Sequence, residues 1–401
     1  MAGPQQQSRA GSRSLWHVTA MLRALILTSR FPDAMRPYLG NFILRQAAAL
    51  AARNGVEVRV VAPVPQSTDS ARVGESALHR LPEEEVWKGL KVYRPRVPAW
   101  TPDSWSHELL PKLRRLRDEF AYNVVHADFF WPDGPAAATL ADALGIPLSV
   151  KARGEDLDVW SRDAGARISL LDAARTGAGL LAVSARLRER MIGLGLPADR
   201  IAVHYSGIDR SLFRVSDRTA AQAALGLKGP ILLLVGNLIA RKGQALAIEA
   251  LAHIPEATLL LAGGGPDREA LEDKVRALGL IARVRMLGPV PQELLPALYG
   301  AASVTLSLSG EEGLANVQLE SLACGTPVVA TDTGGAREAV SRPAAGRVVE
   351  ADPVAIAAAV EELVRRPPER SDVAASVDRF SWDRNAEELQ EHLRRLVNRR
   401  L

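Results

Sequence analysis

An alternation of short β-rich runs with longer amphipathic stretches occurs twice along the chain, and it constrains the fold more than any other feature. The predicted strands of the first series are Ala24–Thr28, Val56–Ala62, Val124–Ala127, Pro147–Val150, Leu180–Val183 and Ile201–His204, and those of the second are Ile231–Val235, Thr258–Ala262, Val284–Leu287, Val304–Leu308 and Pro327–Ala330. Predicted helices include Asn41–Asn54, Leu109–Phe120, Ala245–His253 and Ala355–Val364. Because apolar strands separated by helices form parallel sheets covered on both faces, the sequence predicts an α/β fold with two doubly wound, Rossmann-like domains and a cleft between them.

The alternation breaks near Val215–Ala220, and this break predicts a first domain of residues 21–215 and a second domain that begins at residue 216. The twenty residues before Met21 are polar, rich in Gln, Ser and Arg, and without the apolar core of a signal peptide. We therefore expect residues 1–20 to form a disordered extension, with Met21 as an alternative start.

Composition narrows the class of protein. Apolar residues make up 47% of the 401 residues and charged residues 24%, which is the balance of a soluble globular protein. The single cysteine, Cys324, excludes a disulfide framework and a cysteine-rich zinc site, and it suits a reducing compartment. No apolar run approaches the roughly 18 residues needed to cross a bilayer. The net charge is +4 and the basic excess lies in the first half, which favours an anionic surface or substrate there.

Doubly wound sheets bind ligands where strands end and helices begin, so the strand-to-helix turns are the candidate sites. The first such turn holds Gly40 immediately before a predicted helix, where its backbone either approaches a phosphate or simply bends a surface loop. A later turn, KARGED, carries Arg153 and Asp156, which either orient a sugar or a base or belong to a solvated loop. His126 ends a nearby strand, and both a structural and a catalytic role stay open for it.

The segment VGNLIARKG, residues 235–243, places two cations between a predicted buried strand and a helix. Cations at a helix start are electrostatically unfavourable unless an anion joins them. A lysine in this position is a compact charge with three donors and suits a diphosphate. Lys242 is therefore predicted to contact a phosphate, whereas a phosphate contact and a surface position stay equally open for Arg241.

Three consecutive glycines follow the next strand, in LLLAGGGPDREALE, residues 259–272. They either allow tight strand–helix packing or let a ligand approach the backbone near Gly265. The segment is not the dinucleotide-binding fingerprint, because the third glycine of that pattern would fall where the chain has Arg268.

The segment SLSGEEGLANVQLESLACGTPVVATDTGG, residues 307–335, carries two glutamates with seven residues between them. Glu312 is predicted in the loop after a strand and Glu320 on the following helix, so their carboxylates are expected at different depths of the cleft. A carboxylate accepts hydrogen bonds from vicinal hydroxyls, so the two suit a ribose and a sugar. Backbone N–H groups near Leu314–Asn316 are predicted to bind phosphate. The alternative is a solvated acidic loop followed by a helix glutamate.

Together these segments resemble the retaining glycosyltransferases of family four, the group-one type with the GT-B fold. The resemblance covers about residues 23–400 and is most specific in VGNLIARKG, LAGGGP and EEGLANVQLESLACGTPVVATDTGG, which is followed by Glu338. The segments VVHADFFWPDG, LLAVSARLRERM and SGID also match. The C-terminal FSWDRNAEELQEHLRRL is similar to a helix that returns to the N-terminal domain, so we expect residues 216–380 to form the second domain and residues 381–401 the returning helix.

The resemblance implies transfer of a hexose-type sugar from a UDP- or GDP-sugar donor, with retained anomeric configuration and without a metal ion or cofactor. It implies a donor site in the C-terminal domain and an N-terminal site for a glycan or lipid-linked acceptor, as in cell-surface polysaccharide biosynthesis. Lys242 and Arg241 would neutralise the diphosphate. Glu312 would contact sugar hydroxyls, and Glu320 would contact the ribose. The other implied donor contacts are Gly40, Asn237, Gly265, Gly313, Leu314, Ala315 and Asn316, and the residues implied near the sugar or acceptor are Arg153, Asp156 and His126.

Three features depart from the family pattern. Asn237 stands where the family often has an arginine, Arg153 stands where it often has a histidine, and the first loop has one glycine instead of a pair. These departures keep open a nucleotide-sugar-binding protein without turnover. A further alternative, an NAD-dependent oxidoreductase, lacks the complete dinucleotide fingerprint. A nucleic-acid partner is not expected, because the basic residues are not interleaved with aromatic ones.

The predicted helix Glu108–Phe120 bears on the location of the protein. Leu109, Leu113, Leu116 and Phe120 form one apolar stripe, and basic residues flank it. Such a stripe either faces the protein's own core or lies on an anionic membrane. We therefore expect a cytoplasmic protein, with peripheral contact at the inner face of the plasma membrane and a lipid-linked acceptor as the alternative.

Overall fold

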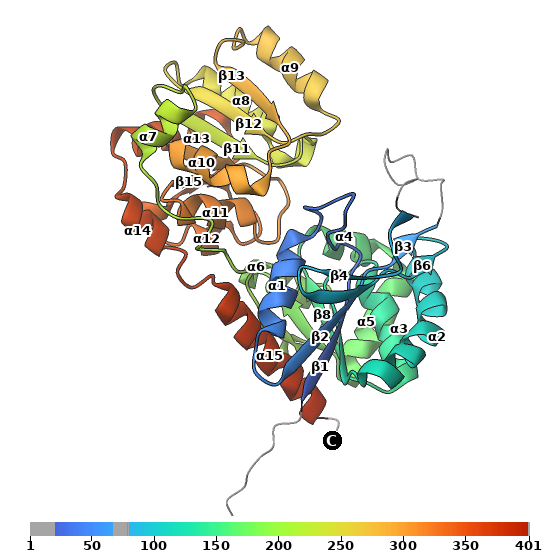
Figure 1. Ribbon diagram of the computed structural model, residues 1–401. Helices are drawn as coiled ribbons and strands as arrows, with labels where there is room; N and C mark the ends of the chain where they lie inside the picture. Colours follow the sequence, from blue (N-terminus) through green and yellow to red (C-terminus); the bar gives the residue numbers. More distant parts are fainter. Residues whose placement is uncertain (1–20, 67–77, 79, 400–401) are drawn as a thin grey trace, which may run out of the picture.

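The computed structural model describes residues 21–66, 78 and 80–399, which form two α/β domains (Figure 1). The first domain is built on an eight-stranded sheet with the order β10-β9-β8-β7-β1-β2-β5-β4. Its strands are β1 (Leu22–Leu27), β2 (Val56–Val61), β4 (Glu84–Trp87), β5 (Leu90–Tyr93), β7 (Val124–Ala127), β8 (Leu148–Ala152), β9 (Gly179–Ala182) and β10 (Ile201–Val203). Neighbouring strands run parallel, except that β4 pairs antiparallel with β5. The extension predicted for residues 1–20 lies outside the described residues.

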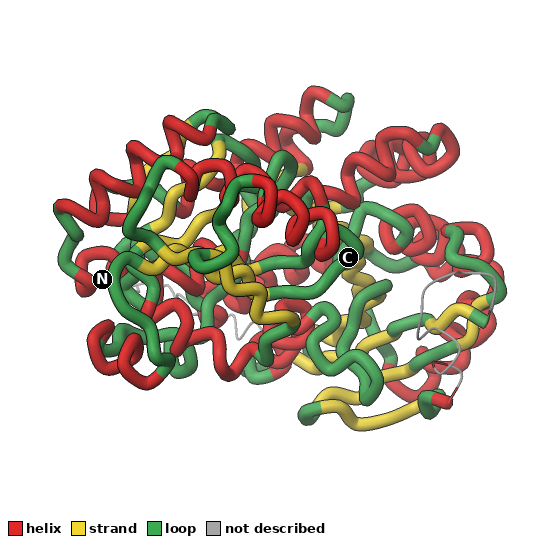
Figure 2. The backbone as a smooth tube through the Cα atoms, turned by 90° about the horizontal axis from the view of Figure 1, so that it is seen from above, coloured by secondary structure: helices red, strands yellow, loops and turns green. Residues whose placement is uncertain are grey.

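The second domain is built on a six-stranded parallel sheet with the order β13-β12-β11-β14-β15-β16. Its strands are β11 (Ile231–Val235), β12 (Thr258–Ala262), β13 (Val284–Gly288), β14 (Val304–Ser307), β15 (Val328–Thr331) and β16 (Gly346–Val349). In the first domain, β3 (Val64–Pro65) and β6 (Arg96–Val97) pair separately. Helices lie on both sides of each large sheet (Figures 1 and 2), which confirms the predicted pair of doubly wound domains.

Helices fill the connections between the parallel strands. In the first domain they are α1 (Asn41–Ala51), α2 (Pro102–Phe120), α3 (Asp133–Leu144), α4 (Glu155–Arg162), α5 (Ala164–Thr176) and α6 (Ala185–Gly193). Those that follow are α7 (Arg218–Ala224), α8 (Gln244–Ala252), α9 (Arg268–Ala277), α10 (Leu295–Ala301), α11 (Asn316–Ala323), α12 (Ala336–Ala339), α13 (Pro353–Arg365), α14 (Arg370–Ala375) and α15 (Trp382–Asn398). Helix α2 begins earlier than predicted, because Thr101 caps it by accepting the Ser104 N–H and Pro102 occupies its first position.

Alternate residues of β1 show why the sheet needs helices on both faces. Leu25 and Leu27 pack into one hydrophobic cluster with α2 and α3, whereas Ala24 and Ile26 pack into another with α1 and α15. All four are at most 1% exposed. Successive side chains of a strand point to opposite faces, so a strand that is apolar at every position must be covered on both.

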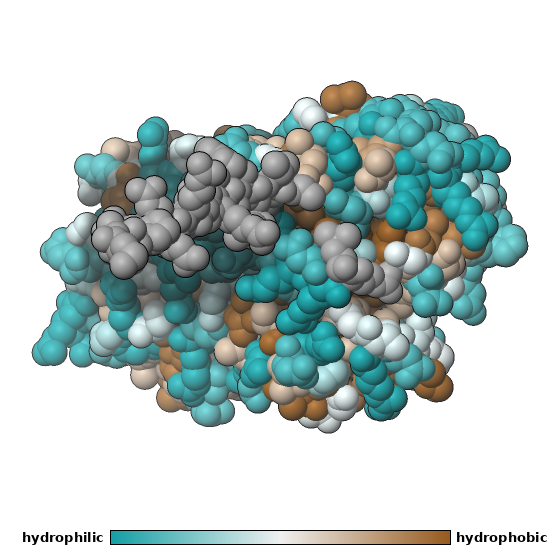
Figure 3. All heavy atoms as spheres, turned by 90° about the horizontal axis from the view of Figure 1, so that it is seen from below, coloured by the Kyte–Doolittle hydropathy of each residue, from teal (hydrophilic) through white to brown (hydrophobic). Residues whose placement is uncertain are grey.

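The apolar stripe of α2 faces the core of the first domain. Leu109, Leu113, Leu116 and Phe120 are at most 6% exposed and belong to the same cluster as Leu25. This burial corrects the alternative in which the apolar stripe lies on a membrane, because the stripe packs in the core of the domain. Seen from below, the described surface is largely hydrophilic (Figure 3). In the described ranges, no helix has the length and apolar character needed to cross a bilayer.

The last helix, α15, leaves the second domain and packs alongside α1 of the first (Figure 1), which confirms the returning helix. Leu389 and Leu393 are fully buried in the contact. His392 Nε2 lies 3.0 Å from Ser149 Oγ of the first sheet. Burial lowers the pKa of His392 to about 3, so the imidazole is neutral and links the returning helix to the first sheet through a hydrogen bond.

Candidate active site

Among the parallel strands of each large sheet the order reverses once, and the loops that leave these two points face the space between the domains. In the first sheet β1 lies between β2 and β7, and in the second β11 lies between β12 and β14. Crevices at such points are where doubly wound sheets bind ligands. Loops of both domains line a cleft of about 940 Å³, with Phe129 and Arg153 on the first domain and Lys242 and Glu312 on the second.

A second cavity, which we call the inner pocket, measures about 580 Å³ and extends from the cleft along the second domain. Phe42, Asn237 and Asn316 line both spaces, so the two are connected. The glycine-rich loop after β12 forms one wall of the inner pocket, and Glu320 lies on another. Side chains of α1 and Trp382 of α15 close it from the side of the first domain.

Glu320 lies on α11 and is only 7% exposed. The Tyr299 hydroxyl donates to its Oε2 at 2.9 Å, and Gln292 Nε2 donates to its Oε1 at 3.4 Å. Burial raises the pKa of Glu320, although both hydrogen bonds oppose the shift. The carboxylate keeps lone pairs on each oxygen, so it can still accept hydrogen bonds from two adjacent hydroxyls of a ligand.

Lys242 ends the short 3₁₀ turn Ala240–Lys242 between β11 and α8, and its side chain meets Glu312 in the cleft. Lys242 Nζ lies 2.5 Å from Glu312 Oε2. The two side chains are 22% and 20% exposed, so a ligand in the cleft can reach both charges. Glu312 belongs to the loop between β14 and α11, so the two loops at the reversal point of the second sheet supply the pair.

Arg241 reaches across to the first domain, where its Nη2 lies 2.6 Å from Glu155 Oε2. The backbones of the two domains also touch next to this ion pair. A Cβ on Gly313 would lie 1.8 Å from the carbonyl oxygen of Arg153, so only glycine fits there. The close contact between the domains therefore explains why residue 313 is a glycine. The charge of Arg241 is neutralised by Glu155.

The N-terminus of α11 opens toward both cavities. The Gln318 N–H donates to the Ala315 carbonyl oxygen, but no side chain of the described residues caps this helix, which leaves the N–H groups of Asn316 and Val317 available. Leu314 and Ala315, which precede the helix, are 7% and 6% exposed. Asn316 lines the cleft and the inner pocket, and its Oδ1 is buried without a hydrogen-bond partner among the described residues. This end of α11 offers donors and an unused acceptor to a bound molecule.

Arg153 lies between two aromatic rings on the first-domain wall of the cleft. Its guanidinium carbon is 4.6 Å from the centre of the Phe42 ring and 5.8 Å from that of Phe129. Its Nη2 donates to Asp128 Oδ1 at 2.5 Å. Burial would raise the pKa of Asp128, but Arg153 and His126 hold it below its usual range. His126 itself is fully buried and lines neither cavity, so the structure places it beneath the cleft.

Three other predicted site residues mainly organise the backbone. A Cβ on Gly40 would lie 2.1 Å from the carbonyl oxygen of Arg30, and one on Gly265 would lie 2.3 Å from that of Leu238. Neither glycine lines the cleft or the inner pocket. Asp156 reaches the edge of the cleft, but its carboxylate accepts hydrogen bonds from the backbone N–H groups of Arg153 and Gly154, just before α4, and of Phe130, in the loop after β7.

Sequence patterns did not predict several residues that complete the site. Tyr299 of α10 holds Glu320, and Asp128 after β7 holds Arg153. Each lies far along the sequence from its partner, and a lone tyrosine or aspartate has no diagnostic spacing. For Tyr299 the sequence offered one signal, which was Glu320 itself: a carboxylate on an apolar helix face requires a hydrogen-bond donor nearby. That requirement predicts a donor without identifying it.

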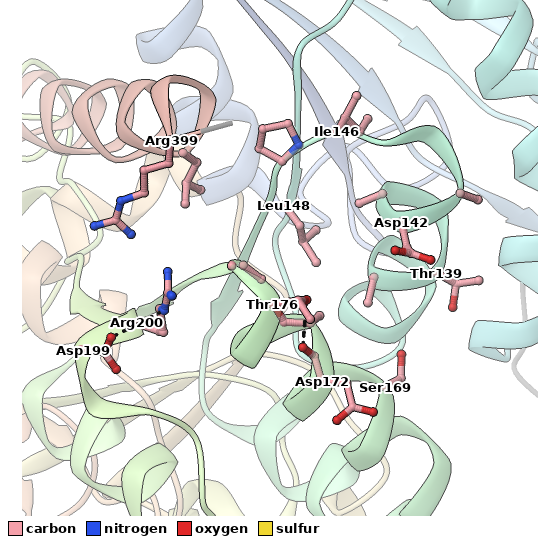
Figure 4. Close-up of a pocket in the computed structure, with 18 residues that line it drawn as sticks. Thr139, Asp142, Ile146, Leu148, Ser169, Asp172, Thr176, Asp199, Arg200 and Arg399 are labelled. Carbon is pink, nitrogen blue, oxygen red and sulfur yellow. Dashed lines mark hydrogen bonds and ion pairs between the residues drawn. The ribbon is translucent and has the colours of Figure 1, made fainter. Parts of the chain in front are cut away.

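A separate cavity of about 880 Å³ lies at the opposite end of the first sheet (Figure 4). Asp142 of α3, Asp172 of α5 and Arg399 after α15 lie around it. Leu148, the first residue of β8, lines this cavity, whereas Arg153 follows the last residue of the same strand and lines the cleft. The cavity therefore lies at the amino ends of the strands, away from the usual ligand position of such sheets.

Comparison with known proteins matches both halves of the chain. Residues 39–207 match the family model of the glycosyl transferase 4-like domain, and residues 216–380 match that of glycosyl transferases group 1. A D-inositol 3-phosphate glycosyltransferase of Rhodococcus jostii (strain RHA1) is 30% identical over 395 residues, covering 88% of this chain and 84% of that protein. A Bacillus subtilis (strain 168) glycosyltransferase named for teichuronic acid biosynthesis is 28% identical over 332 residues, covering 78% of this chain and 82% of that protein.

Solved structures share the whole two-domain arrangement. Sucrose-phosphate synthase from Thermosynechococcus elongatus superimposes with a TM-score of 0.77 at 21% identity, covering 94% of this chain and 100% of that one. Anabaena HepE in complex with UDP gives a TM-score of 0.74 at 21% identity, with the same coverage. These likenesses show the GT-B fold, and the family models and the relatives account for both domains. The chain therefore belongs to the group 1 glycosyl transferases of family four.

Proposed function

We propose that the protein transfers a hexose-type sugar from a UDP- or GDP-sugar to a glycan or lipid-linked acceptor, with retained anomeric configuration and without a metal ion. The observation that carries this proposal is the Lys242–Glu312 pair, which lies in the cleft next to the inner pocket lined by Glu320. In one extended donor molecule, the cation would bind the diphosphate, the carboxylate of Glu312 would bind the sugar, and the deeper carboxylate of Glu320 would bind the ribose.

The leaving diphosphate is the group whose charge the site must balance. Lys242 and the N–H groups at the start of α11 would bind its oxygens, and charge that is stabilised as it develops lowers the barrier. Glu312 would exchange its contact with Lys242 for hydroxyls of the donor sugar. Arg241 would assist after separating from Glu155. Because these cations belong to the protein itself, we expect transfer to continue in EDTA.

The acceptor hydroxyl would enter from the first-domain wall, where Arg153 lies between Phe42 and Phe129. It would attack the anomeric carbon on the face that the diphosphate leaves. A diphosphate oxygen would take the hydroxyl proton as the carbon–oxygen bond to the leaving group breaks and the new glycosidic bond forms. The product would then keep the anomeric configuration of the donor, and neither glutamate would act as a glycosidase-type nucleophile.

Known proteins support a nucleotide-sugar donor and a role in cell-surface polysaccharide assembly. Anabaena HepE has been crystallised with UDP and with UDP-glucose. The relatives are named for D-inositol 3-phosphate glycosyl transfer and for teichuronic acid biosynthesis. We therefore infer a uridine or guanosine diphosphate sugar as the donor and a cytoplasmic step of cell-surface polysaccharide assembly as the setting.

Turnover with a panel of UDP- and GDP-sugars and mixed glycan acceptors, in EDTA, tests this function. We expect release of the nucleoside diphosphate with one donor, and NMR of the product should show the anomeric configuration of that donor. Glu312→Gln is expected to lose transfer, because an uncharged amide is a weaker acceptor for the donor sugar's hydroxyls. An inverted product would contradict retention, and loss of activity in EDTA would contradict metal independence.

Asn237 and Arg153, which depart from the family pattern, favour one alternative, a protein that binds nucleotide sugars without turnover. Nucleotide binding without release from any donor in the panel would support that alternative.

A further inference from the structure

Among the cations that line the cleft, Arg30 differs from the others in lacking a carboxylate partner. In the described part of the chain the pairs are Arg36 with Asp33, Arg153 with Asp128, Arg241 with Glu155, and Lys242 with Glu312. Arg30 lines the same cleft, and no carboxylate of the described ranges lies within ion-pair distance of it. Its guanidinium carbon lies 5.4 Å from the centre of the Phe129 ring. Arg30 therefore brings to the first-domain wall a positive charge that has no ion-pair partner in the described ranges.

The backbone of Arg30 is fixed, although its side chain is exposed. Arg30 follows β1 at the point where the strand order of the first sheet reverses. Thr28 Oγ1 accepts the Arg30 N–H at 3.2 Å, and Gly40 packs directly against the Arg30 carbonyl group. The charge therefore projects from a defined position at the carboxyl end of β1, where a ligand of this sheet is expected.

Aromatic side chains line the same cleft as this charge. Phe129, Trp100 and Trp131 line the same cleft as Arg30. Trp100 is 39% exposed, and its ring packs edge-on against Trp105 with the ring centres 5.0 Å apart. Walls of aromatic groups with a few fixed polar groups are typical of sites for organic ligands. The less polar face of a sugar ring fits such a wall, with an attached anion within reach of Arg30.

We propose that the acceptor is an anionic sugar whose phosphate or carboxylate binds Arg30 while its ring lies against these aromatic side chains. The guanidinium fork matches either oxyanion with two parallel hydrogen bonds. The assignment rests on the proposed function, because that function puts the acceptor on the first domain and the donor on the second. One carboxylate that lines the cleft, Glu311, also lacks an ion-pair partner in the described ranges. It belongs to the loop before α11, on the second domain, so it lies on the side proposed for the donor and not on the side proposed for the acceptor.

Sugar binding to the nucleotide-loaded protein tests the assignment. UDP and GDP binding is measured first, and glucose 6-phosphate, glucuronate and glucose are then titrated calorimetrically at constant ionic strength. We expect wild-type protein to prefer an anionic sugar to glucose, and the comparison of the two anions identifies phosphate or carboxylate. Arg30→Gln is expected to weaken binding of that anion by about 10- to 100-fold and to leave glucose unchanged. Arg114→Gln, which removes the same charge from an exposed position on α2, is expected to change neither.

The failure of this assignment and that of the proposed function give different results. Absence of binding by either nucleotide contradicts the proposed function and the assignment with it. Nucleotide binding without preference for an anionic sugar, or with the same preference in Arg30→Gln, overturns the assignment alone. Weakened nucleotide binding in Arg30→Gln would also overturn it, because Arg30 would then serve the donor. An equal loss in Arg114→Gln would reveal a long-range charge effect and would overturn it as well.

Discussion

Lys242→Met is expected to lower the turnover of sugar transfer by roughly 10²–10³-fold. Methionine keeps the length of the unbranched stem but cannot balance the charge that develops on the departing diphosphate. Lys242 is the cation that touches Glu312, and both residues also line the small space at the start of α11, where the diphosphate is proposed to bind. Turnover is measured as nucleoside diphosphate release at saturating donor, and KM is expected to change less than turnover.

Lys274 offers a matched control for this variant, because it pairs with Glu249 elsewhere in the same domain. Lys274→Met removes the same ammonium group from a Lys–Glu pair outside the cleft and should leave turnover unchanged. Lys242→Arg restores the charge in another shape and should recover part of the activity. A Lys242→Met protein with turnover close to that of the wild type would contradict the proposed role of the lysine.

Glu320→Ala is expected to weaken binding of the nucleoside diphosphate by about 10- to 100-fold, because charge-assisted hydrogen bonds to the ribose are lost. The matched ligand is the 2′-deoxynucleoside diphosphate, which lacks one of the two ribose hydroxyls. Wild-type protein should prefer the ribonucleotide in calorimetric titrations, and Glu320→Ala should bind both ligands about equally. An unchanged preference in the variant would mean that another group contacts the ribose.

The carboxylate of Glu320 is also expected to make nucleotide affinity depend on pH, in a direction that its pKa shift predicts. Burial raises the pKa of Glu320, and only the ionised form offers both oxygens as acceptors. Nucleotide affinity is therefore expected to be full above this raised pKa and to fall as the pH decreases through it. Glu320→Gln should bind more weakly and lack this component, so an identical pH profile in wild type and Glu320→Gln would contradict the assignment.

Much of the fold could be predicted because the central strands are continuous apolar runs bounded by turns. The bounds of β11 and β12 coincide with the predicted Ile231–Val235 and Thr258–Ala262. The edge strand β4 could not be predicted in this way. It contains Glu84 and Glu85, is half exposed along its length, and owes its conformation to pairing with β5. Tertiary pairing decided its structure more than local sequence did.

The candidate site could be predicted as far as the positions of residues relative to strand ends. Lys242 and Glu312 follow β11 and β14, which are neighbours in the sheet, so their meeting follows from the topology. The direction of each side chain could not be predicted. His126 also lies at a strand end, yet it points into the core and is buried. The ion pair of Arg241 with Glu155 depends on how the two domains approach each other, which no local pattern encodes.

The proposed function requires a nucleoside diphosphate to bind between Lys242 and Glu320, and thermal stabilisation in EDTA tests this requirement most directly. A ligand at about 100 times its dissociation constant should add roughly 2.7 kcal/mol to the free energy of unfolding. We expect this stabilisation by UDP or GDP in wild-type protein, no stabilisation by NAD, and a much smaller stabilisation by the same nucleotide in Lys242→Met. Stabilisation by NAD alone, or an undiminished nucleotide effect in Lys242→Met, would contradict a diphosphate site at Lys242.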